Sequence, residues 1–464
     1  MIVASAWAGK RHAVYGLARS GVATVRALLA GGAEVVAWDE REEARTNILP
    51  ELASGRGTTR SVVEGIGTMP LHHSAVAERS PSPSKLGEEL TLADPLTLDL
   101  TFFDAVVVSP GVPLNTHPLT ARARDAGVAI IGDIELFAQA RAQLPPHRVV
   151  GITGTNGKST VTALIHHMCR TAGVPSLAAG NIGEPILAAE PLPAGGVYVL
   201  ELSSYQIDQT RSLDCDVAVL LNITPDHLDR YADFDAYAAA KARLFAMQSP
   251  ERTAVIALAD APSAAIAESA RARVRRVAPG VCLDQSRWPA LGGPHNAANA
   301  LCAIEVAHAL GLPEDAIDRA LETYAGLPHR LERVAESRGV LFVNDSKATN
   351  PEAAAPALAA YDRVHWIVGG LAKGECLGPC ADQLSHVVRA YTIGAAGADF
   401  ADALEGRVPV SRSGTLDAAV ADAAARAQPG DTVLLSPACA SFDQFTDFAE
   451  RGARFRALVE ALPC

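Results

Sequence analysis

Short runs of β-branched and aliphatic residues alternate with longer Ala- and Leu-rich stretches along the whole chain. The runs fall at residues 35–39, 105–111, 149–154, 197–203, 217–223, 340–345, 364–370 and 432–438. This alternation is typical of parallel sheets with helices on both faces. Most of the runs end on or near Gly, Ser, Pro or another polar residue, and such sheets bind ligands beyond the carboxyl ends of their strands. The pattern therefore predicts an α/β protein with its chemistry at the strand ends.

The chain is too long for a single hydrophobic core. Its 464 residues correspond to roughly three domains of ordinary size, about 150 residues each. Two proline-containing breaks, Leu144-Pro145-Pro146 and Gly326-Leu327-Pro328, mark the expected boundaries. The predicted domains are residues 1–145, 146–328 and 329–464. Between about residues 53 and 100 the pattern decays into Gly, Ser, Thr and Pro, which indicates an insertion in the first domain.

Composition and charge exclude several classes of function. Hydrophobic residues make up 49% of the chain and charged residues 20%, which favours a folded protein. The formal net charge is −12 and no Lys/Arg-rich block occurs, so nucleic acid is not an expected partner. The sequence has neither the order of segments of a secretory signal nor a stretch of membrane-spanning length. We therefore expect a cytoplasmic protein without membrane insertion.

The eight cysteines are scattered along the chain, which indicates reduced thiols and not a disulfide framework. Cys376 and Cys380 have a spacing that suggests a metal pair, but no second Cys or His pair lies at ligand spacing. Two loop cysteines are therefore the preferred interpretation over a zinc site.

The strongest local signal is a glycine loop between an apolar run and a helical stretch. Residues 151–160 read Gly-Ile-Thr-Gly-Thr-Asn-Gly-Lys-Ser-Thr. Glycines let backbone N–H groups surround phosphate oxygens, while Lys158 supplies a cation and Ser159 a hydroxyl for Mg²⁺. Ile152 replaces the first glycine of the GxxxxGK[ST] motif, so the loop is a variant, and an ordinary glycine turn is the alternative. The expected nucleotide contacts are Gly154, Thr155, Asn156, Gly157, Lys158, Ser159 and Thr160.

The sequence Thr-Gly-Thr-Asn-Gly-Lys-Ser at residues 153–159 resembles the phosphate loop of the Mur ligases and the related folylpolyglutamate synthetases. Further motifs that resemble this family lie at residues 180–183, 201–206, 222–230 and 293–299, so the resemblance covers nearly the whole chain. It implies a Rossmann-like N-terminal domain, a central P-loop-type ATPase domain with a parallel sheet, and a Rossmann-like C-terminal domain.

Two polar residues after central strands are candidate metal ligands. Glu201 follows the apolar run at 197–200, where a carboxylate can bind a hard cation that bridges phosphates. The alternative is that Glu201 only caps the next helix. His227 lies in a polar loop, and the resemblance implies a Mg²⁺ ligand or an active-site contact. A lone loop histidine is otherwise a surface residue.

Lys241 interrupts the apolar stripe of a predicted helix at residues 233–248, which begins at Asp233 or Asp235. One interpretation is a lysine whose stem covers the core while its ammonium group reaches water. The resemblance implies instead that this lysine is carbamylated. Burial would lower its pKa, the neutral amine would add CO₂, and the carbamate would offer an oxygen ligand to Mg²⁺.

The N-terminal region carries a degenerate dinucleotide fingerprint at residues 14–21, in which Ala18 replaces the middle glycine. It is therefore a weak match to a nicotinamide site. In the Mur ligases the corresponding domain holds the uridine diphosphate of the precursor. The resemblance implies that the precursor contacts are Gly16, Leu17, Ala18, Arg19, Ser20, Asp39, Ser109, Pro110, Gly111 and Asn181.

The C-terminal region carries motifs at residues 327–332, 344–351 and 435–445, the last of which resembles the glutamate-adding members of the family. The resemblance implies that Asn299, Arg330, Asp345 and Lys347 contact ATP. The implied amino-acid contacts are Thr349, Lys373, Ser441 and Phe442. Leu371-Ala372 stands where the family usually has Asp-Gly, and Phe442 where Leu is frequent. No motif like the DNPR of the diaminopimelate- or lysine-adding relatives occurs.

The resemblance thus implies an ATP- and Mg²⁺-dependent amide ligase that adds D-glutamate to UDP-N-acetylmuramoyl-L-alanine in peptidoglycan synthesis, acting as a monomer. The implied catalytic residues are Lys158, His227 and Lys241, and the implied metal ligands are Ser159, Glu201, His227 and Lys241 as its carbamate. The alternatives are another amide ligase of the same superfamily, a regulatory P-loop NTPase and a nicotinamide-dependent oxidoreductase.

Overall fold

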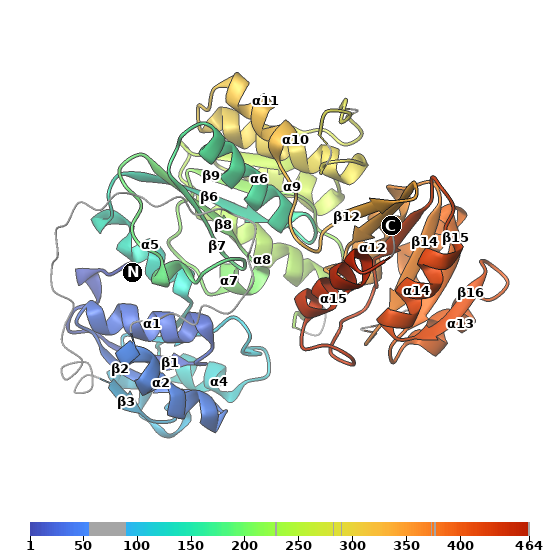
Figure 1. Ribbon diagram of the computed structural model, residues 1–464. Helices are drawn as coiled ribbons and strands as arrows, with labels where there is room; N and C mark the ends of the chain where they lie inside the picture. The colour runs from blue at the N-terminus through green and yellow to red at the C-terminus, as the bar shows by residue number, and fades with distance from the viewer. Residues whose placement is uncertain are drawn as a thin grey trace. The chain divides into compact units, whose positions relative to one another are not determined.

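The computed structural model describes residues 1–54, 90–227, 230–281, 283–288, 290–372, 374 and 377–462 (Figure 1). Three sheets of five, six and six strands form its framework, and the predicted α/β architecture is confirmed. The chain forms two compact units, Met1–Lys158 with Gly173–Arg276 and Ser159–Ala172 with Val277–Cys464. No helix among the described residues is long and apolar enough to cross a membrane.

The N-terminal sheet is parallel, with the strand order β3-β2-β1-β4-β5. Its strands are β1 (Arg11–Tyr15), β2 (Glu34–Trp38), β3 (Leu90–Leu92), β4 (Ala105–Val108) and β5 (Ala129–Ile131). Its helices are α1 (Arg19–Ala30), α2 (Glu42–Ser54), α4 (Pro118–Asp125) and α5 (Asp133–Ala140). Val107 of β4 shares a core with Leu28 of α1, whereas Val106 shares a different core with Leu119 of α4. Because successive side chains of a strand point to opposite faces, both faces of this sheet are buried.

The insertion predicted between about residues 53 and 100 agrees with the structure only in part. Residues 55–89 lie outside the described residues. Strand β3 pairs in parallel with β2 and so extends the sheet, which the decayed hydrophobic pattern did not predict. Asp94 and Asp99 then each start a short 3₁₀ turn by accepting a backbone hydrogen bond two residues on. The last part of the predicted insertion therefore belongs to the folded domain, and Leu100 is buried there.

The central sheet has the strand order β11-β10-β9-β6-β8-β7. Its strands are β6 (His147–Thr153), β7 (Ser176–Gly180), β8 (Gly196–Glu201), β9 (Val217–Leu220), β10 (Thr253–Ala257) and β11 (Arg273–Val277). Strand β6 pairs in parallel with both β8 and β9, so the carboxyl ends of these three strands share one edge. The helices between residues 158 and 323 are α6 (Lys158–Thr171), α7 (Ser204–Asp208), α8 (Phe234–Ala246), α9 (Ala261–Ser269), α10 (Pro294–Ala309) and α11 (Glu314–Thr323). Of the two predicted caps of α8, Asp233 is the one that forms, with its side chain accepting from Ala236 N.

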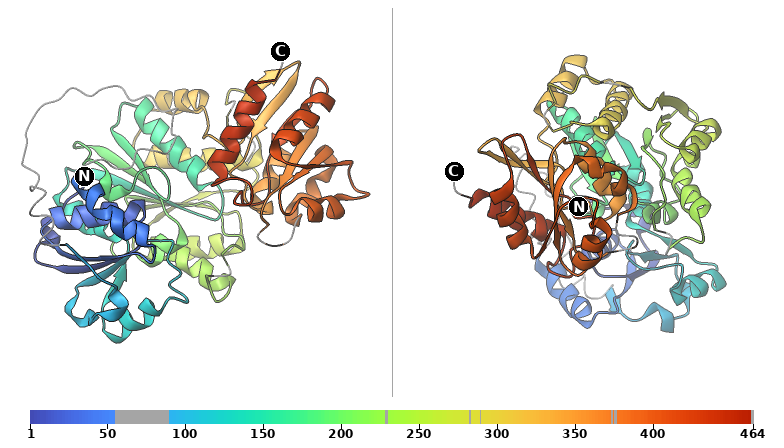
Figure 2. Two further views of the ribbon diagram at one scale, coloured as in Figure 1. Left: turned by 60° about the horizontal axis from the view of Figure 1, so that its bottom comes forward. Right: turned by 90° about the vertical axis from the view of Figure 1, so that its right-hand side faces the viewer.

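The C-terminal sheet has the strand order β12-β13-β17-β14-β15-β16. This part of the chain is coloured orange to red in Figure 2. Its strands are β12 (Glu332–Ser337), β13 (Val340–Asn344), β14 (Val364–Gly369), β15 (Val387–Ile393), β16 (Val410–Gly414) and β17 (Thr432–Leu435). Its helices are α12 (Pro351–Ala359), α13 (Gly397–Leu404), α14 (Leu416–Arg426) and α15 (Phe448–Glu460). The 3₁₀ helices among the described residues are η1 (Ser5–Trp7), η2 (Pro95–Thr97), η3 (Leu100–Phe102), η4 (Arg141–Gln143), η5 (Ile186–Ala188) and η6 (Gly378–His386).

One edge of this sheet departs from the predicted parallel arrangement, because β12 pairs with β13 in the antiparallel sense. The two strands are joined through Arg338 and Gly339, which have φ angles of 53° and 74°. Two consecutive positive φ angles give the turn a twist that matches a two-residue hairpin. The other neighbouring strands of this sheet, β13 with β17, β17 with β14, β14 with β15 and β15 with β16, pair in parallel.

Candidate functional site

The glycine loop follows β6 at the edge where β8 and β9 also end. Gly154 has a φ of 150°, and a Cβ atom there would lie 3.1 Å from Leu221 Cβ and 3.3 Å from Asn222 O. Asn222, just after β9, closes the loop: its Oδ1 accepts from Asn156 N at 2.9 Å, and its backbone oxygen accepts from Thr155 N at 2.9 Å. Glycine is therefore required at position 154 both by the backbone conformation and by the close approach of β9.

Lys158, the first residue of α6, folds back onto this loop. Its Nζ donates to Gly154 O at 2.9 Å and to Thr155 O at 2.7 Å. The next residue, Ser159, is buried, and its Oγ accepts from Arg330 Nη2 at 2.9 Å. The structure thus places a cation at the mouth of the loop and joins two of the residues that the resemblance assigns to ATP, Ser159 and Arg330.

Lys241 approaches the same loop from α8. It is 1% exposed, its Nζ donates to Gly154 O at 2.9 Å, and it lies 4.6 Å from the centre of the Tyr237 ring. Burial, followed by repulsion from the Lys158 ammonium group, lowers the pKa of Lys241 well below its usual value. The alternative in which its ammonium group reaches water is therefore wrong, because the side chain ends inside the protein.

Glu201 ends β8 and is also buried. Its Oε1 accepts from Asn181 Nδ2 at 2.7 Å, whereas its Oε2 is buried and has no hydrogen-bond partner among the described residues. The alternative role as a helix cap is wrong, because Ser203 caps α7 in a capping box with Gln206. A buried carboxylate oxygen that lacks a protein donor fits a cation ligand.

His227 lies in the loop after β9 with a φ of 56°, a left-handed conformation that is uncommon outside glycine. Its ring lies 5.0 Å from that of Tyr205 and 6.1 Å from that of Tyr237, centroid to centroid. The Tyr237 hydroxyl in turn lies 3.1 Å from Thr155 Oγ1 in the glycine loop. Within the described part of the chain, no three His, Cys, Asp or Glu side chains cluster as a metal site by themselves.

The N-terminal glycine turn is built by the same kind of close approach. Gly16 has a φ of 93°, and a Cβ atom there would lie 2.9 Å from Ser109 Cβ. Ser109 Oγ donates to Gly16 O at 2.8 Å, and Leu17 N donates to Asp39 Oδ2 at 2.7 Å. Burial opposes ionisation of Asp39, but hydrogen bonds from Arg41 and Leu17 hold its pKa below the usual value. Gly16, Leu17, Asp39 and Ser109 of the predicted precursor set are thus brought together at the ends of β1, β2 and β4. Asn181 of the same set lies instead after β7 of the central sheet, where it contacts Glu201.

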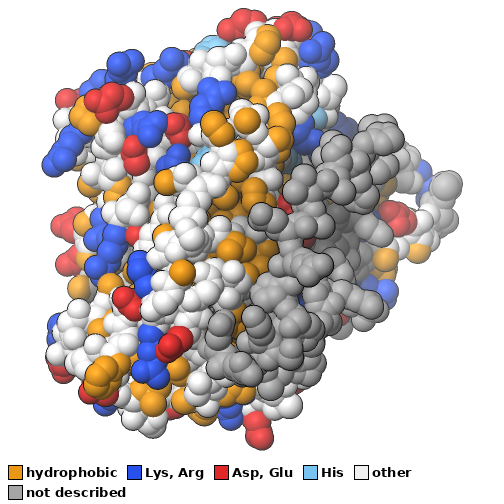
Figure 3. All heavy atoms as spheres, turned by 90° about the vertical axis from the view of Figure 1, so that its left-hand side faces the viewer, with side chains coloured by type: hydrophobic (Ala, Val, Ile, Leu, Met, Phe, Trp, Pro, Cys, Tyr) orange, Lys and Arg blue, Asp and Glu red, His pale blue; other side chains and the backbone are white. Residues whose placement is uncertain are grey.

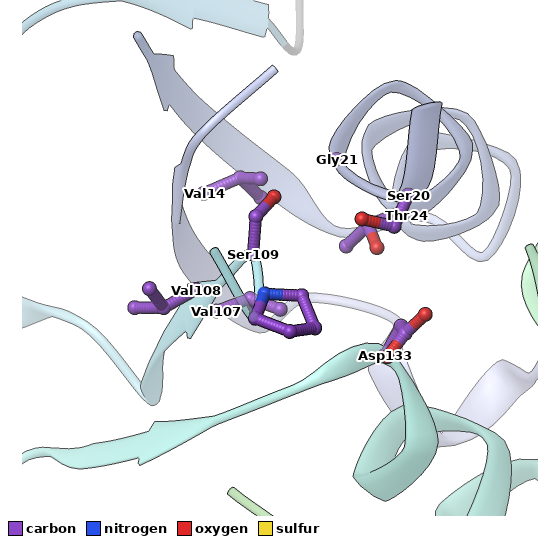
Figure 4. A pocket seen from close by; sticks show the side chains of 9 residues that line it. Val14, Ser20, Gly21, Thr24, Val107, Val108, Ser109 and Asp133 are labelled. Atoms are coloured by element: carbon purple, nitrogen blue, oxygen red, sulfur yellow. The ribbon is translucent and has the colours of Figure 1, made fainter. Parts of the chain in front are cut away.

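A small pocket lies beside this turn (Figure 4). Ser20, Ser109 and Pro110 of the predicted precursor set line it, together with Asp133 at the start of α5. Burial raises the pKa of Asp133 to about 6, and its Oδ1 accepts from Ile134 N at 2.9 Å. Asp133 was not among the residues predicted from the sequence, although its place at the start of a helix shortly after a strand was a usable signal.

In the C-terminal domain, Asp345 follows β13 and is buried. Burial raises its pKa to about 7, while Ser436 Oγ donates to its Oδ2 at 2.7 Å. Lys347 Nζ lies 3.8 Å from the centre of the Phe448 ring. Of the residues assigned to the amino acid, Ser441 is buried, Phe442 is 68% exposed, and Lys373 lies outside the described residues.

The remaining predicted contacts lie on or just before helices. Thr349 is partly buried just before α12, and Asn299 is buried on α10, where its Nδ2 donates to Asn296 Oδ1 at 3.3 Å. Thr160 lies in the first turn of α6. Of the two cysteines predicted to lie in loops, Cys376 lies outside the described residues. That prediction is wrong for Cys380, a buried thiol in η6 whose Sγ donates to Pro351 O at 3.3 Å.

Arg451 of α15 was also missed, and it joins two of the C-terminal motifs. It is 1% exposed; its Nη2 donates to Ser346 O at 2.9 Å and to Cys439 O at 3.0 Å. Its Nη1 donates to Ala440 O at 3.3 Å. The usable signal in the sequence was an arginine four residues before Phe455, on the apolar stripe of a predicted helix.

Two family models match the chain. The Mur ligase middle domain matches residues 152–307, and the Mur ligase glutamate ligase domain matches residues 329–439. The chain is similar over its whole length to proteins named UDP-N-acetylmuramoylalanine--D-glutamate ligase. The protein of Novosphingobium aromaticivorans is 57% identical, with 100% of this chain and 97% of the relative covered. That of Sphingopyxis alaskensis is 56% identical, with 100% of both covered.

Solved structures share the fold at lower identity. The UDP-N-acetylmuramate-alanine ligase of Thermotoga maritima has a TM-score of 0.56 at 16% identity, with 97% of this chain and 99% of that chain covered. The FolC protein of E. coli, solved with DHPP and ADP, has a TM-score of 0.54 at 20% identity, with 71% and 93% covered. From the full-length similarity and the two family models, the chain belongs to the Mur ligase family, in the group of UDP-N-acetylmuramoylalanine--D-glutamate ligases.

Proposed function

We propose that the chain joins D-glutamate to UDP-N-acetylmuramoyl-L-alanine, driven by ATP, in peptidoglycan biosynthesis in the cytoplasm. Relatives more than half identical over their full length carry the name of this ligase. The observation that carries the proposal is the glycine loop on which two lysines converge, because Lys158 and Lys241 both donate to Gly154 O. An ordinary glycine turn would not require two lysines, one of them buried, at a single carbonyl.

The glycine loop is assigned to the phosphates of ATP. Its backbone N–H groups and Lys158 would bind phosphate oxygens. On binding, Lys158 Nζ would release its hydrogen bonds to Gly154 O and Thr155 O and donate to the phosphate instead. Mg²⁺, when bound, neutralises charge on the phosphate oxygens. The residues assigned to hold it are Ser159, Glu201, His227 and Lys241 as its carbamate. The buried Oε2 of Glu201 supports this assignment, since it has no donor among the described residues.

Lys241 is assigned a carbamate. Its lowered pKa favours the uncharged amine, whose lone pair can add to CO₂. Loss of one proton then gives a carbamate with an anionic oxygen. Such an oxygen is a ligand of the kind that Mg²⁺ prefers. The nearby cation of Lys158 would stabilise the new negative charge.

In the proposed reaction the carboxylate of the precursor attacks the γ-phosphate, giving an acyl phosphate and ADP. The amine of glutamate then attacks the acyl carbon and phosphate leaves. Residues 16–20, 109–111, Asp39 and Asn181 are assigned to the precursor. Asn299, Arg330, Asp345 and Lys347 are assigned to ATP, and Thr349, Lys373, Ser441 and Phe442 to glutamate. Donors and a cation suit an amino acid with two carboxylates.

A coupled phosphate-release assay tests the proposal. UDP-N-acetylmuramoyl-L-alanine, ATP and Mg²⁺ are supplied with D-glutamate, L-glutamate, L-alanine or diaminopimelate in parallel. We expect release that requires both the precursor and D-glutamate. Equal release with L-alanine or diaminopimelate, or release that does not depend on the precursor, would contradict the assignment.

A further inference from the structure

Arg230 is the last residue of the motif at 222–230 and has no role in the proposed reaction. It lies three residues after His227, and its backbone N–H donates to His227 O at 2.9 Å. A turn therefore ties Arg230 to His227, whose ring lies beside those of Tyr205 and Tyr237. The side chain, however, leaves the central sheet and reaches the residues that follow β4 of the N-terminal sheet.

The guanidinium group contacts three successive backbone carbonyls. Arg230 Nη2 donates to Val112 O at 2.8 Å and to Pro110 O at 3.4 Å, and Nη1 donates to Gly111 O at 3.4 Å. These carbonyls belong to residues 109–112, which we call the precursor loop. A planar guanidinium with several N–H groups in a fixed fork can bind adjacent carbonyls together, whereas a lysine ammonium is a single point charge.

The same guanidinium group packs against the face of an aromatic ring. Its central carbon lies 4.3 Å from the centre of the Tyr205 ring on α7, well inside the range of about 6 Å for a cation over an aromatic face. Tyr205 also lies beside His227, with ring centres 5.0 Å apart. The ring thus limits the directions in which Arg230 can point and holds it toward the precursor loop.

The opposite end of the precursor loop is fixed to the N-terminal glycine turn. Ser109 N donates to Tyr15 O at 3.0 Å, and Ser109 Oγ donates to Gly16 O at 2.8 Å. The turn is closed by Val112 N, which donates to Ser109 O at 3.1 Å. Ser109 therefore anchors the start of the loop, while Arg230 provides side-chain donors for the three residues that follow.

We propose that Arg230 is a positioning residue that holds the precursor loop against the turn carrying His227. This inference rests on the proposed function, which assigns the precursor loop to UDP-N-acetylmuramoyl-L-alanine. Arg230 acts by fixing the loop in its binding conformation, so its loss weakens binding of the precursor and leaves ATP binding at the glycine loop intact. The geometry of the fork, more than the positive charge, carries the effect.

The experiment compares Arg230→Met and Arg230→Lys with the wild type in the phosphate-release assay, with KM measured separately for the precursor and for ATP. We expect both variants to raise the precursor KM about tenfold, with the ATP KM within twofold of wild type. Calorimetric titration of the precursor without ATP should show the same weakening. Arg122→Met is the matched control. Arg122 lies on α4 and, like Arg230, donates to a backbone carbonyl, but its acceptor is Leu98 O at 2.7 Å and not the precursor loop.

Each outcome decides the inference. A precursor KM within twofold of wild type in both variants overturns it, as does full recovery in Arg230→Lys, which would assign the effect to charge alone. Equal increases in both KM values would show a general disturbance and also overturn it. If Arg230→Met fails to fold, Arg230→Lys and Tyr205→Leu, which removes the supporting ring, test the same prediction. Failure of the wild type to use the precursor would instead reject the proposed function.

Discussion

Lys158 and Lys241 both donate to Gly154 O but differ in burial, and we expect this difference to give them different chemical roles. Lys158 lies at the edge of the glycine loop, where it is only partly buried. Lys241 is 1% exposed, so it bears the cost of desolvation and, in addition, the repulsion of Lys158. The lowered pKa favours the uncharged, nucleophilic form of the Lys241 amine, whereas Lys158 is proposed as the cation for phosphate.

Lys158→Ala tests the role of the cation. We expect the variant to stay folded and its turnover to fall by about 10³-fold, because a fixed cation on the transferring phosphate is lost. Phosphate release measures the rate, and circular dichroism checks the fold. Lys10→Ala, at an exposed lysine, is the control and should keep full activity. Turnover near wild type in a folded Lys158→Ala protein would reject the assignment.

Lys241→Ala tests the carbamate. We expect a nearly inactive variant that is partly rescued by acetate or formate at high concentration, because the truncation leaves space for a small anion that supplies the missing oxygen ligand. The measurement is phosphate release over a series of anion concentrations, with chloride at equal ionic strength as the control. Activity close to wild type without any added anion would contradict the carbamate.

At the scale of elements, each glycine turn is fixed by the residue that follows a neighbouring strand. Asn222 after β9 holds the loop after β6, and Ser109 after β4 holds the turn after β1. Parallel strands place their carboxyl ends at one edge, so residues distant in the sequence meet there. In the N-terminal turn, Asp39 already accepts from Leu17 N and from Arg41, so its oxygens are engaged by the protein itself.

The N-terminal turn is expected to bind a uridine-diphosphate sugar and not a nicotinamide cofactor. Ala18 replaces the glycine that lets a backbone approach the pyrophosphate of NAD, and the hydrogen bonds to Asp39 compete with a ribose hydroxyl. Calorimetric titration with ADP absent should give saturable binding of UDP-N-acetylmuramoyl-L-alanine and none of NAD or NADH. An NAD affinity in the micromolar range would overturn this assignment.

At the scale of the whole molecule, surface charge is spread, while several ionisable residues are buried. Basic and acidic side chains are interspersed on the face drawn in Figure 3, in keeping with a net charge of −12 that is not gathered in one block. Inside the N-terminal sheet, His12 of β1 is 2% exposed, and its Nδ1 has no hydrogen-bond partner among the described residues. Burial lowers the pKa of His12 to about 4.

This pKa predicts a loss of stability in acid. Between pH 6.5, near the pKa of an unfolded histidine, and pH 4, the unfolded chain binds a proton at His12 that the folded chain does not. The contribution of neutral, buried His12 to the free energy of unfolding is therefore fully present above pH 6.5 and is lost as the pH decreases toward 4. We expect His12→Leu to reduce the drop in Tm between pH 7.5 and pH 5, measured by circular dichroism. An equal drop in both proteins would contradict the burial argument.

Local sequence determined most elements and the positions of the main chemical groups. Most strands, the glycine loop, α6 and the start of α8 near Asp233 or Asp235 depend on residues within a few positions of one another, and such short spacings leave a readable pattern. The apolar stripe also located Lys241, but it allowed either an exposed or a buried amine. The tertiary structure decided this question, because burial depends on what packs over the helix and not on the helix alone.

The contacts that link separate elements were decided only by the tertiary structure. Arg230 meets Val112 across 118 positions of the chain, and Arg451 meets Ser346 across 105. Both arginines bind backbone carbonyls, and Asn222 likewise closes its loop through backbone atoms. Every residue has a backbone carbonyl, so such an acceptor leaves no mark in the sequence. The sequence therefore supplied the donors and the strand ends, whereas the pairing of distant strands determined which carbonyls those donors reach.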